Sequence, residues 1–425
     1  MKIGFSHLFD QKFPATIMRQ LRRNALRVGG DAALELFLAD SDETRSVLKA
    51  GFKRIYKLRA NRSRGGAWCR AETLRMFRSR NFQTAVALIQ SAIKDDYSSL
   101  AEARHIADCA RDLSVDEAVT LKPQEKATGG ERIIVKHGPI KSVRNRAMAL
   151  LVEAASGPFE FEYCQLGKGG VEAAAKHIGE GVLQDYRFWI TYDLTNAYPS
   201  VKLDHVNDII PVHGQLMREV GFPSYSYKKI ANEDGVRPGL TEGASHSSKI
   251  LSAFTDGPLR KISGSTMVLC YADNIAIGAR TLDEAKCAFK TFENAMSASK
   301  ADPIHLHSVN ICDAFHHHGQ VKEGSLTYRN GVDFCQYRIS YDLFDDKLRY
   351  RANTLAFLKA KQNTFARLSG VTDEDEMEAI VDAYLMNWIR AFRLWKVDAN
   401  TLECLKQTRD WWVYEFKYGK TIDAA

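Results

Sequence analysis

The sequence predicts an α+β protein in which helical segments at both ends flank a central part rich in β-strands. Apolar residues recur at helical spacing through roughly the first 115 residues, and the same spacing returns over about the last 75. Strand-like runs and glycine turns fill the middle. No low-complexity linker separates these parts, so we expect them to pack as one body. The expected regions are 1–116, 117–345 and 346–425.

The composition predicts a large soluble protein. The chain has 425 residues, 45% of them hydrophobic, which is enough to bury an extensive core. It contains no run of about 18 apolar residues and no signal-peptide-like start, so we expect a cytoplasmic protein that does not act in a membrane. The eight cysteines are scattered without a CxxC pair, which favours reduced thiols over a disulfide framework or a zinc site.

Positive charge is concentrated near the N-terminus. The first 80 residues contain 18 Lys and Arg against 7 Asp and Glu, although the whole chain has a net charge of only +7. A stretch so rich in arginine predicts a surface that binds a polyanion, most simply a nucleic-acid backbone. The alternative is an ordinary solvated helical face. The candidate contacts in this stretch are Arg62, Arg64 and Arg70.

Local patterns predict the order of the helices and strands. Apolar spacing and terminal signals predict helices over 14–28, 31–60, 82–113, 140–156, 171–178, 247–254, 282–299, 348–369, 373–395 and 400–417. Strand patterns predict a hairpin over 119–135 with a glycine turn, and a strand near 303–311. The dipeptide Asn330-Gly331 is the strongest short hairpin signal in the chain.

Two apolar segments carry one aspartate each, 80 residues apart. Asp193 closes a strand that is apolar enough to be buried on both faces. Asp273 lies within Ala272-Asp273-Asn274, which interrupts two β-prone runs and predicts a tight hairpin with the aspartate at its tip. Two carboxylates on adjacent strand ends suit a pair of Mg²⁺ ions, and such a pair catalyses phosphoryl transfer. The alternative is that two buried aspartates cap turns by coincidence.

The order of six segments resembles the palm region of reverse transcriptases, which are right-hand polymerases. The first three are a glycine-turn hairpin (Lys122–Arg132), a glycine-containing stretch (Cys164–Ala175) and an aspartate followed five residues later by an aromatic residue (Asp193–Ser200). The other three are a turn before a helix (Gly239–Ser247), a Tyr-x-Asp-Asn hairpin (Tyr271–Asn274) and a strand that resembles the primer grip (Phe334–Ile339). The resemblance covers roughly half of the chain. It implies a right-hand polymerase fold, with fingers and palm around an antiparallel sheet, a helical N-terminal extension and a helical C-terminal thumb.

The resemblance implies a metal centre and a nucleotide site. Asp193 and Asp273, with the neighbouring Leu194, would hold two Mg²⁺ ions, with Mn²⁺ as an alternative ion, and Asn274 completes the predicted catalytic set. Tyr198 would lie under the sugar, where its ring leaves no room for a 2′-hydroxyl, so that dNTPs are favoured.

Further residues would contact the nucleotide or the nucleic acid. Lys126 and Arg132 are candidates to clamp the triphosphate, because guanidinium and ammonium groups match phosphate oxygens. Gly243 would let the backbone approach the base pair, and Glu242 lies beside the sugar. Arg144 and Lys168 are expected to contact nucleic acid.

The chain departs from the family pattern at three places. Asn274 stands where the family usually has a second aspartate, and Thr241-Glu242 replaces a Pro-Gln pair. The lysine expected on the strand after the 282–299 helix is missing. We therefore hypothesise that His305 or His307 protonates the leaving pyrophosphate, because imidazole can donate a proton near neutral pH.

The resulting functional expectation is primer extension with dNTPs by a two-metal mechanism, most simply RNA-templated DNA synthesis. The partners are an RNA template or noncoding RNA, a DNA product and dNTPs, and a second copy of the chain or a partner protein is left open. The architecture resembles bacterial reverse transcriptases of phage defence. Two alternatives remain: template-independent or protein-guided DNA synthesis, and a catalytically degenerate palm that serves as a nucleic-acid-binding scaffold.

Overall fold

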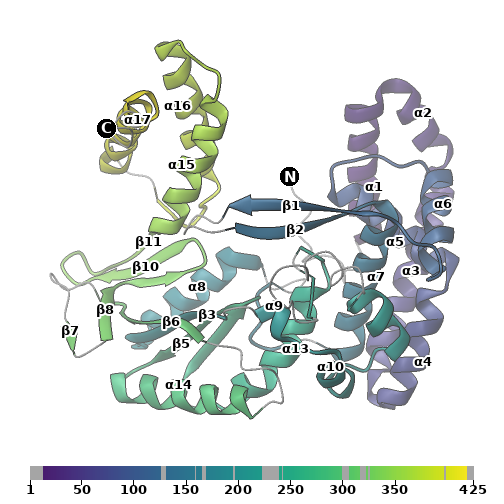
Figure 1. Ribbon diagram of the computed structural model, residues 1–425, viewed down its shortest axis with the longest axis horizontal. Helices are drawn as coiled ribbons and strands as arrows, with labels where there is room; N and C mark the ends of the chain where they lie inside the picture. Colours follow the sequence, from purple (N-terminus) through teal and green to yellow (C-terminus); the bar gives the residue numbers. More distant parts are fainter. Residues whose placement is uncertain are drawn as a thin grey trace.

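Helices form both ends of the chain, and β-sheets packed with helices form its middle, which confirms the predicted α+β class (Figure 1). The computed structural model describes residues 13–125, 131–157, 159–164, 169–194, 197–222, 239–241, 243–298, 306–315, 322–323, 326–396 and 399–418. Within these residues, no helix has the length and apolar character needed to cross a bilayer. All eight cysteines are free thiols, as the sequence predicts.

The N-terminal part is a block of packed helices. Its elements are α1 (Phe13–Asn24), η2 (Ala25–Gly29), α2 (Gly30–Ala39), α3 (Ser41–Ala60), η3 (Arg62–Arg64), α4 (Gly66–Phe77), α5 (Arg80–Ile93) and α6 (Leu100–Arg111). The single helix expected over 82–113 is wrong, because the chain leaves the helix after Ile93 and starts again behind Ser99. The Ser99 side chain and Glu102 form a capping box there, which satisfies free backbone N–H groups at the start of α6.

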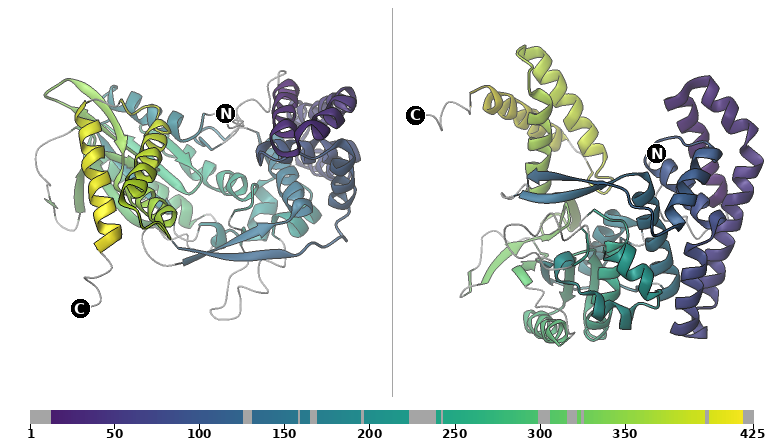
Figure 2. Two further views of the ribbon diagram at one scale, coloured as in Figure 1. Left: turned by 90° about the horizontal axis from the view of Figure 1, so that it is seen from above. Right: turned by 45° about the vertical axis from the view of Figure 1, so that its right-hand side comes forward.

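A hairpin and a long buried helix follow this block. β1 (Val119–Glu125) pairs in antiparallel fashion with β2 (Glu131–His137), as predicted. α7 (Pro139–Ser156) is buried along most of its length because it packs against α5 and α6 on one side and α13 on another. In Figures 1 and 2 the hairpin projects from the N-terminal block toward the C-terminal helices.

A six-stranded sheet forms the centre of the molecule. Its strand order is β4-β5-β3-β6-β8-β7, from β3 (Phe188–Leu194), β4 (Met267–Tyr271), β5 (Asn274–Ala279), β6 (Leu306–Asp313), β7 (Lys322–Glu323) and β8 (Leu326–Asn330). All neighbouring pairs are antiparallel except β6 and β8. The strand β3 alternates between two cores, since Ile190 and Tyr192 belong to one cluster and Trp189 belongs to the other.

Helices cover both faces of this sheet. One face packs against α14 (Leu282–Ser297), which in turn contacts α13 (Ser247–Arg260), whereas α8 (Gly170–Val182) packs beside β4 on the other. Short helical segments connect β3 to α13: α9 (Ala197–Ser200), α10 (Leu203–Ile209), α11 (Gly214–Leu216) and η4 (Met217–Gly221). The burial of β3 on both faces, predicted from its apolar run, is confirmed.

The C-terminal part combines a small sheet with three helices. Its elements are β9 (Val332–Phe334), β10 (Tyr337–Asp342), β11 (Lys347–Ala352), α15 (Thr354–Leu368), α16 (Glu374–Arg390) and α17 (Ala399–Tyr418). The hairpin predicted at Asn330-Gly331 is wrong, because β8 pairs within the central sheet and β9 pairs with β10. The helix predicted from residue 348 is also wrong over its first turn, where Lys347–Ala352 pairs with β10.

A buried histidine makes the stability of this fold depend on pH. His246 is fully buried at the start of α13, and its Nε2 lies 3.2 Å from the Gly221 carbonyl oxygen. Burial disfavours the charged imidazolium and lowers the pKa of His246 to about 4. The neutral His246 side chain therefore contributes to the free energy of unfolding in full above the ordinary pKa of about 6.5, and this contribution is lost as the pH falls toward 4.

We therefore expect the wild-type free energy of unfolding to fall by about 2 kcal/mol more than that of His246→Gln between pH 7 and pH 5. Urea unfolding followed by circular dichroism at the two pH values measures this difference. The exposed His105→Gln is the control, and its pH dependence should match wild type. Identical pH dependence in wild type and His246→Gln would contradict this interpretation.

Candidate active site at the β3 and β4–β5 strand ends

The sheet brings Asp193 and Asp273 together. Asp193 pairs in register with Asn274 across β3 and β5, and Asp273 occupies the turn between β4 and β5. The backbone N–H of Leu194 donates to the Asp273 carbonyl oxygen at 3.0 Å, which ties the turn to β3. The Asp193 carboxyl group also lies within hydrogen-bonding reach of the Asp273 carboxyl group. The hairpin predicted around Asp273 is thus confirmed, and its aspartate meets the one at the end of β3.

Negative charge accumulates at this point of the sheet. Burial raises the pKa of Asp273, and the charge of Glu162 raises it further, although hydrogen bonds to the carboxylate oppose the shift. Cys335, in the turn between β9 and β10, has its thiol pKa raised by burial and by the charges of Asp273, Glu162 and Asp193. A bound cation would relieve this mutual repulsion.

The residues next to the two aspartates complete the strand ends. The Asn274 amide nitrogen donates to the Asp273 carboxylate at 3.2 Å, so its amide oxygen is the atom left to contact a ligand. The register between β3 and β6 shifts between Thr191 and Asp193, which places His307 opposite Asp193. The His307 side chain and the whole of His305 lie outside the described residues, so proton donation by either histidine remains a hypothesis.

The segment with Tyr198 lies beside the predicted glycine turn. The backbone N–H of Leu240 donates to the Tyr198 carbonyl oxygen at 2.8 Å. Gly243 has φ +85°, a left-handed conformation that favours glycine, and a Cβ there would lie 3.6 Å from Ile134 of β2. Ser247 then donates to the Thr241 carbonyl oxygen at 2.7 Å at the start of α13. The structure therefore brings the Tyr198 and Gly243 segments next to each other and to the β1–β2 hairpin.

Sequence reasoning missed one residue behind this site. Glu162 is fully buried, and its two carboxylate oxygens accept hydrogen bonds from Cys164, Ala272, Ser252 and Cys270. The only sequence signal is an acid within the aromatic run Phe159–Tyr163. Alternation in that run indicates an outward-facing acid, yet Phe161 and Glu162 are both buried.

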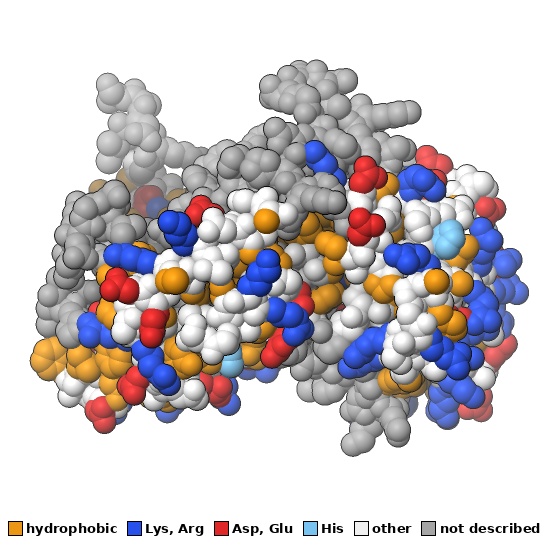
Figure 3. All heavy atoms as spheres, turned by 90° about the horizontal axis from the view of Figure 1, so that it is seen from below, with side chains coloured by type: hydrophobic (Ala, Val, Ile, Leu, Met, Phe, Trp, Pro, Cys, Tyr) orange, Lys and Arg blue, Asp and Glu red, His pale blue; other side chains and the backbone are white. Residues whose placement is uncertain are grey.

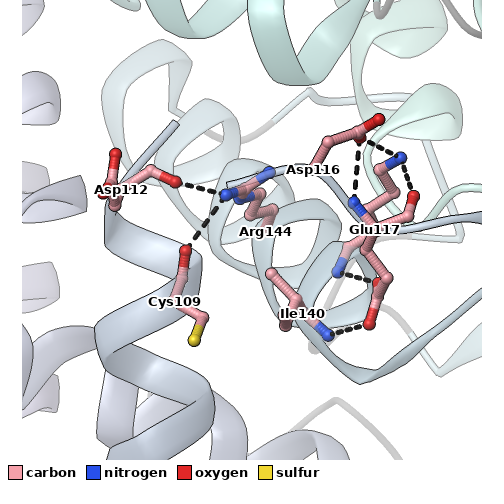
Figure 4. Close-up of polar contacts among 7 residues, drawn as sticks. Cys109, Asp112, Asp116, Glu117, Ile140 and Arg144 are labelled. Atoms are coloured by element: carbon pink, nitrogen blue, oxygen red, sulfur yellow. Dashed lines mark hydrogen bonds and ion pairs between the residues drawn. The ribbon is translucent and has the colours of Figure 1, made fainter. Parts of the chain in front are cut away.

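The structure shows a structural role for Arg144, and its predicted nucleic-acid contact stays a prediction. Its side chain is buried and donates to the Ala110 carbonyl oxygen at 3.0 Å. It also donates to the carbonyl oxygens of Cys109, at 3.0 Å, and Asp112 (Figure 4). These carbonyl groups lie at or just beyond the C-terminus of α6. Arg144 therefore joins α7 to the N-terminal block, since a buried guanidinium must have its donors satisfied.

Acidic side chains fix the base of the β1–β2 hairpin to the same helix. Glu117 accepts hydrogen bonds from the backbone N–H groups of Ile140 at 3.0 Å and Lys141 at 2.7 Å (Figure 4). Its carboxylate thus caps the N-terminus of α7, where negative charge is favourable. The Lys141 ammonium group contacts Asp116 at 2.7 Å. These contacts therefore hold the residues just before β1 against the N-terminus of α7.

The N-terminal arginines divide into structural and exposed ones. Arg70 donates to the Asn207 carbonyl oxygen at 3.1 Å, and Arg62 lies against Gly157 at the end of α7. Arg64 is exposed and stacks over the Trp68 ring with 5.5 Å between its Cζ and the ring centroid. Of the three predicted contacts, Arg64 is therefore the best placed to meet a ligand.

A row of exposed basic residues also lies along α3, and we call it the α3 ridge. It consists of Lys49, Lys53, Arg54 and Lys57. No acidic residue occurs between Glu43 and Glu72, so nothing in that stretch of sequence offsets the charge. Figure 3 shows Lys and Arg side chains gathered over the N-terminal helices, at the right of the view. Sequence counting indicated this region but did not identify the ridge.

Several predicted contacts fall outside the described residues. These are Lys126, between β1 and β2 in the sequence, Lys168, before α8, and Glu242, next to Gly243. The Arg132 backbone pairs with Gln124 in the hairpin, but its side chain is not among those described. Their roles stay predictions.

The donor set at the strand ends fits a hard divalent cation. The candidate centre contains the carboxylates of Asp193 and Asp273 and the Asn274 amide. Among the described residues, no three or more His, Cys, Asp or Glu side chains gather as a metal site. Mg²⁺ is commonly bound through one or two carboxylates, with water and substrate phosphates completing its shell. No protein-family model matches the chain, and no curated protein matches it in sequence.

Proposed function

We propose that this chain is a nucleotidyltransferase of the right-hand polymerase type that extends a primer with dNTPs, with RNA as the template. The observation that carries the proposal is the meeting of Asp193 and Asp273 at adjacent strand ends of an antiparallel sheet. Two carboxylates so placed support a two-metal centre for phosphoryl transfer. The neighbouring Tyr198 and Gly243 segments supply the surface on which a nucleotide would rest.

Each residue has a stated part in this mechanism. Asp193 and Asp273 would hold the cations, and their placement on β3 and the β4–β5 turn keeps them in one geometry. Two Mg²⁺ ions, when bound, activate the primer hydroxyl and neutralise charge on the triphosphate. Tyr198 would exclude a 2′-hydroxyl from the sugar position. Gly243, which carries no side chain, would let the backbone approach the base pair.

Binding of a nucleic-acid template is supported by the surface charge of the N-terminal block. The α3 ridge and Arg64 present positive charge on the part of the chain that precedes the sheet. A nucleic-acid backbone is the partner that such a surface attracts most strongly.

The decisive experiment incubates purified protein, with its co-purifying nucleic acid, with Mg²⁺ and labelled dNTPs. Both the bound RNA and any DNA product are sequenced. A product complementary to the bound RNA supports the proposal. A product without a complement in the RNA indicates template-independent or protein-guided synthesis, and absence of product with retained RNA binding indicates a binding scaffold.

Replacement of Tyr198 tests the preference for deoxynucleotides. We expect Tyr198→Ala to lower the ratio of kcat/KM for a dNTP over the matching rNTP by about tenfold to a hundredfold, because space opens for the 2′-hydroxyl. Single-nucleotide incorporation kinetics with both substrates measure the ratio. Tyr198→Phe keeps the ring and should stay within about threefold of wild type. Unchanged discrimination in Tyr198→Ala would show that another residue selects the sugar.

A further inference from the structure

A buried carboxylate supports the turn that carries Asp273 from behind. Glu162 lies in the segment 159–164 and forms an isolated parallel β-bridge with Cys270 of β4. The Tyr163 N–H donates to the Cys270 carbonyl oxygen, and the Cys270 N–H donates to the Phe161 carbonyl oxygen, both at 2.8 Å. These bonds place Glu162 next to Cys270, two residues before Ala272.

All four donors around this carboxylate come from fixed backbone or buried side chains. Oε1 accepts from the N–H of Cys164 at 2.7 Å and from the N–H of Ala272 at 3.2 Å. Oε2 accepts from Ser252 Oγ at 2.6 Å and from Cys270 Sγ at 3.5 Å. A buried carboxylate is costly unless its oxygens are paired, and these four donors offset that cost.

The Ala272 N–H is the donor that matters for the site. Ala272 has φ +58°, a left-handed conformation that costs a side-chain-bearing residue about 1 kcal/mol or more. Such a conformation persists only when surrounding contacts hold it. On one side, the Asp273 carbonyl oxygen accepts from Leu194; on the other, the Ala272 N–H donates to Glu162. Asp273 lies between these two attachments.

A second set of contacts holds the Glu162 segment itself. Lys249, buried in α13, donates through Nζ to the Cys164 carbonyl oxygen at 2.8 Å and lies 3.9 Å from the Glu153 carboxylate of α7. Ser252 is on the same helix α13. The segment, the helix and the turn therefore form one hydrogen-bonded unit behind the candidate metal centre.

We propose that Glu162 is a positioning residue that sets the β4–β5 turn so that the Asp273 carboxylate meets Asp193 at the distance a shared divalent cation requires. The inference rests on the proposed function, because the cation it positions is the one that function needs. Glu162 itself does not contact the cation, since both of its oxygens are used by protein donors.

Two conservative substitutions separate the effect of the length of the Glu162 side chain from the effect of its charge. Glu162→Gln keeps the length and one oxygen for the Cys164 and Ala272 amides but removes the charge. Glu162→Asp keeps the charge but draws the carboxylate back by one methylene. The exposed neighbour Glu160→Asp is the matched control, and Asp273→Asn is the reference for loss of the cation site.

Hydrogen exchange and Mn²⁺ binding are the readouts, because neither requires polymerase activity. Exchange of the Ala272 and Cys164 amides reports the turn, and electron paramagnetic resonance reports Mn²⁺ affinity. We expect Glu162→Asp to expose both amides and weaken Mn²⁺ binding by about tenfold to a hundredfold, as replacement of residues that support metal ligands does. Glu162→Gln should stay within about threefold of wild type, and Glu160→Asp should match it.

Three results would overturn the inference. The first is amide exchange and Mn²⁺ affinity in Glu162→Asp that match wild type. The second is a loss of Mn²⁺ affinity in Glu162→Gln as large as that in Glu162→Asp, and the third is unaltered Mn²⁺ binding in Asp273→Asn. A role limited to stability would lower the melting temperature of Glu162→Asp without changing the Mn²⁺ affinity of the folded protein, and this outcome would also overturn the inference. If wild type binds Mn²⁺ through Asp273 yet makes no DNA, the proposed function fails while the Glu162 measurements still decide this inference.

Discussion

Asp193→Asn and Asp273→Asn are each expected to lower the rate of dNTP incorporation by about a thousandfold. Two-metal centres supply several kcal/mol of transition-state stabilisation, and about 4 kcal/mol corresponds to that factor. An asparagine keeps the size of the side chain but removes the charge that would hold the proposed cations. Single-turnover incorporation with saturating dNTP and Mg²⁺ measures the rate.

Stability separates this loss from unfolding. The pKa of Asp273 is raised, so the fold favours its neutral form, and Asn resembles that form. Without added Mg²⁺, Asp273→Asn should therefore unfold at the same temperature as wild type or slightly above it. Losing activity while keeping or gaining stability is typical of a residue retained for function.

Asp313 of β6 offers a matched control, because it lies beside the opposite end of β3 from Asp193. Asp313 faces Phe188 in the β3–β6 register and forms a salt bridge with Arg187 at 2.6 Å. Asp313→Asn removes a carboxylate from the same sheet and should keep incorporation within about tenfold of wild type, because it lies away from the strand ends that hold the aspartates. Full activity in Asp193→Asn would end the polymerase interpretation.

The candidate centre could be predicted because its signals are local. The apolar run of β3 and the short interruption at Ala272-Asp273-Asn274 each define an element within a few residues. Their meeting is a property of the sheet order, in which β3 and β5 are neighbours. The similarity in motif order anticipated that neighbourhood, but composition and periodicity alone do not specify it.

The parts that could not be predicted depend on tertiary contacts. Glu162 and Arg144 are both charged residues that the fold buries because fixed partners satisfy them, and a sequence pattern shows no such partners. Gly331 has the φ of +81° that the Asn-Gly signal predicts, but the chain uses it to pass between two sheets. Local turn chemistry was right there, and the strand pairing was wrong.

Charge reversal on the α3 ridge is expected to weaken nucleic-acid binding by about a hundredfold at physiological salt. Lys53→Glu, Arg54→Glu and Lys57→Glu together would remove three proposed phosphate contacts and add repulsion. All three side chains are exposed, whereas Val47, Phe52 and other residues of α3 form its buried face, so the fold should be retained. Fluorescence anisotropy with single-stranded RNA at several salt concentrations measures affinity.

The salt dependence distinguishes a binding surface from a solvated helix. A loss of about three phosphate contacts should reduce the slope of log affinity against log salt by about three. Lys261→Glu with Lys290→Glu alters exposed lysines at the C-terminus of α13 and on α14 and should leave the slope unchanged. An unaltered slope in the α3 variant would show that the α3 ridge is an ordinary solvated helical face.

Asp193→Asn should keep RNA affinity while losing synthesis, and the ridge variant should recover synthesis at saturating RNA. These opposite outcomes would place binding and chemistry on different parts of the chain.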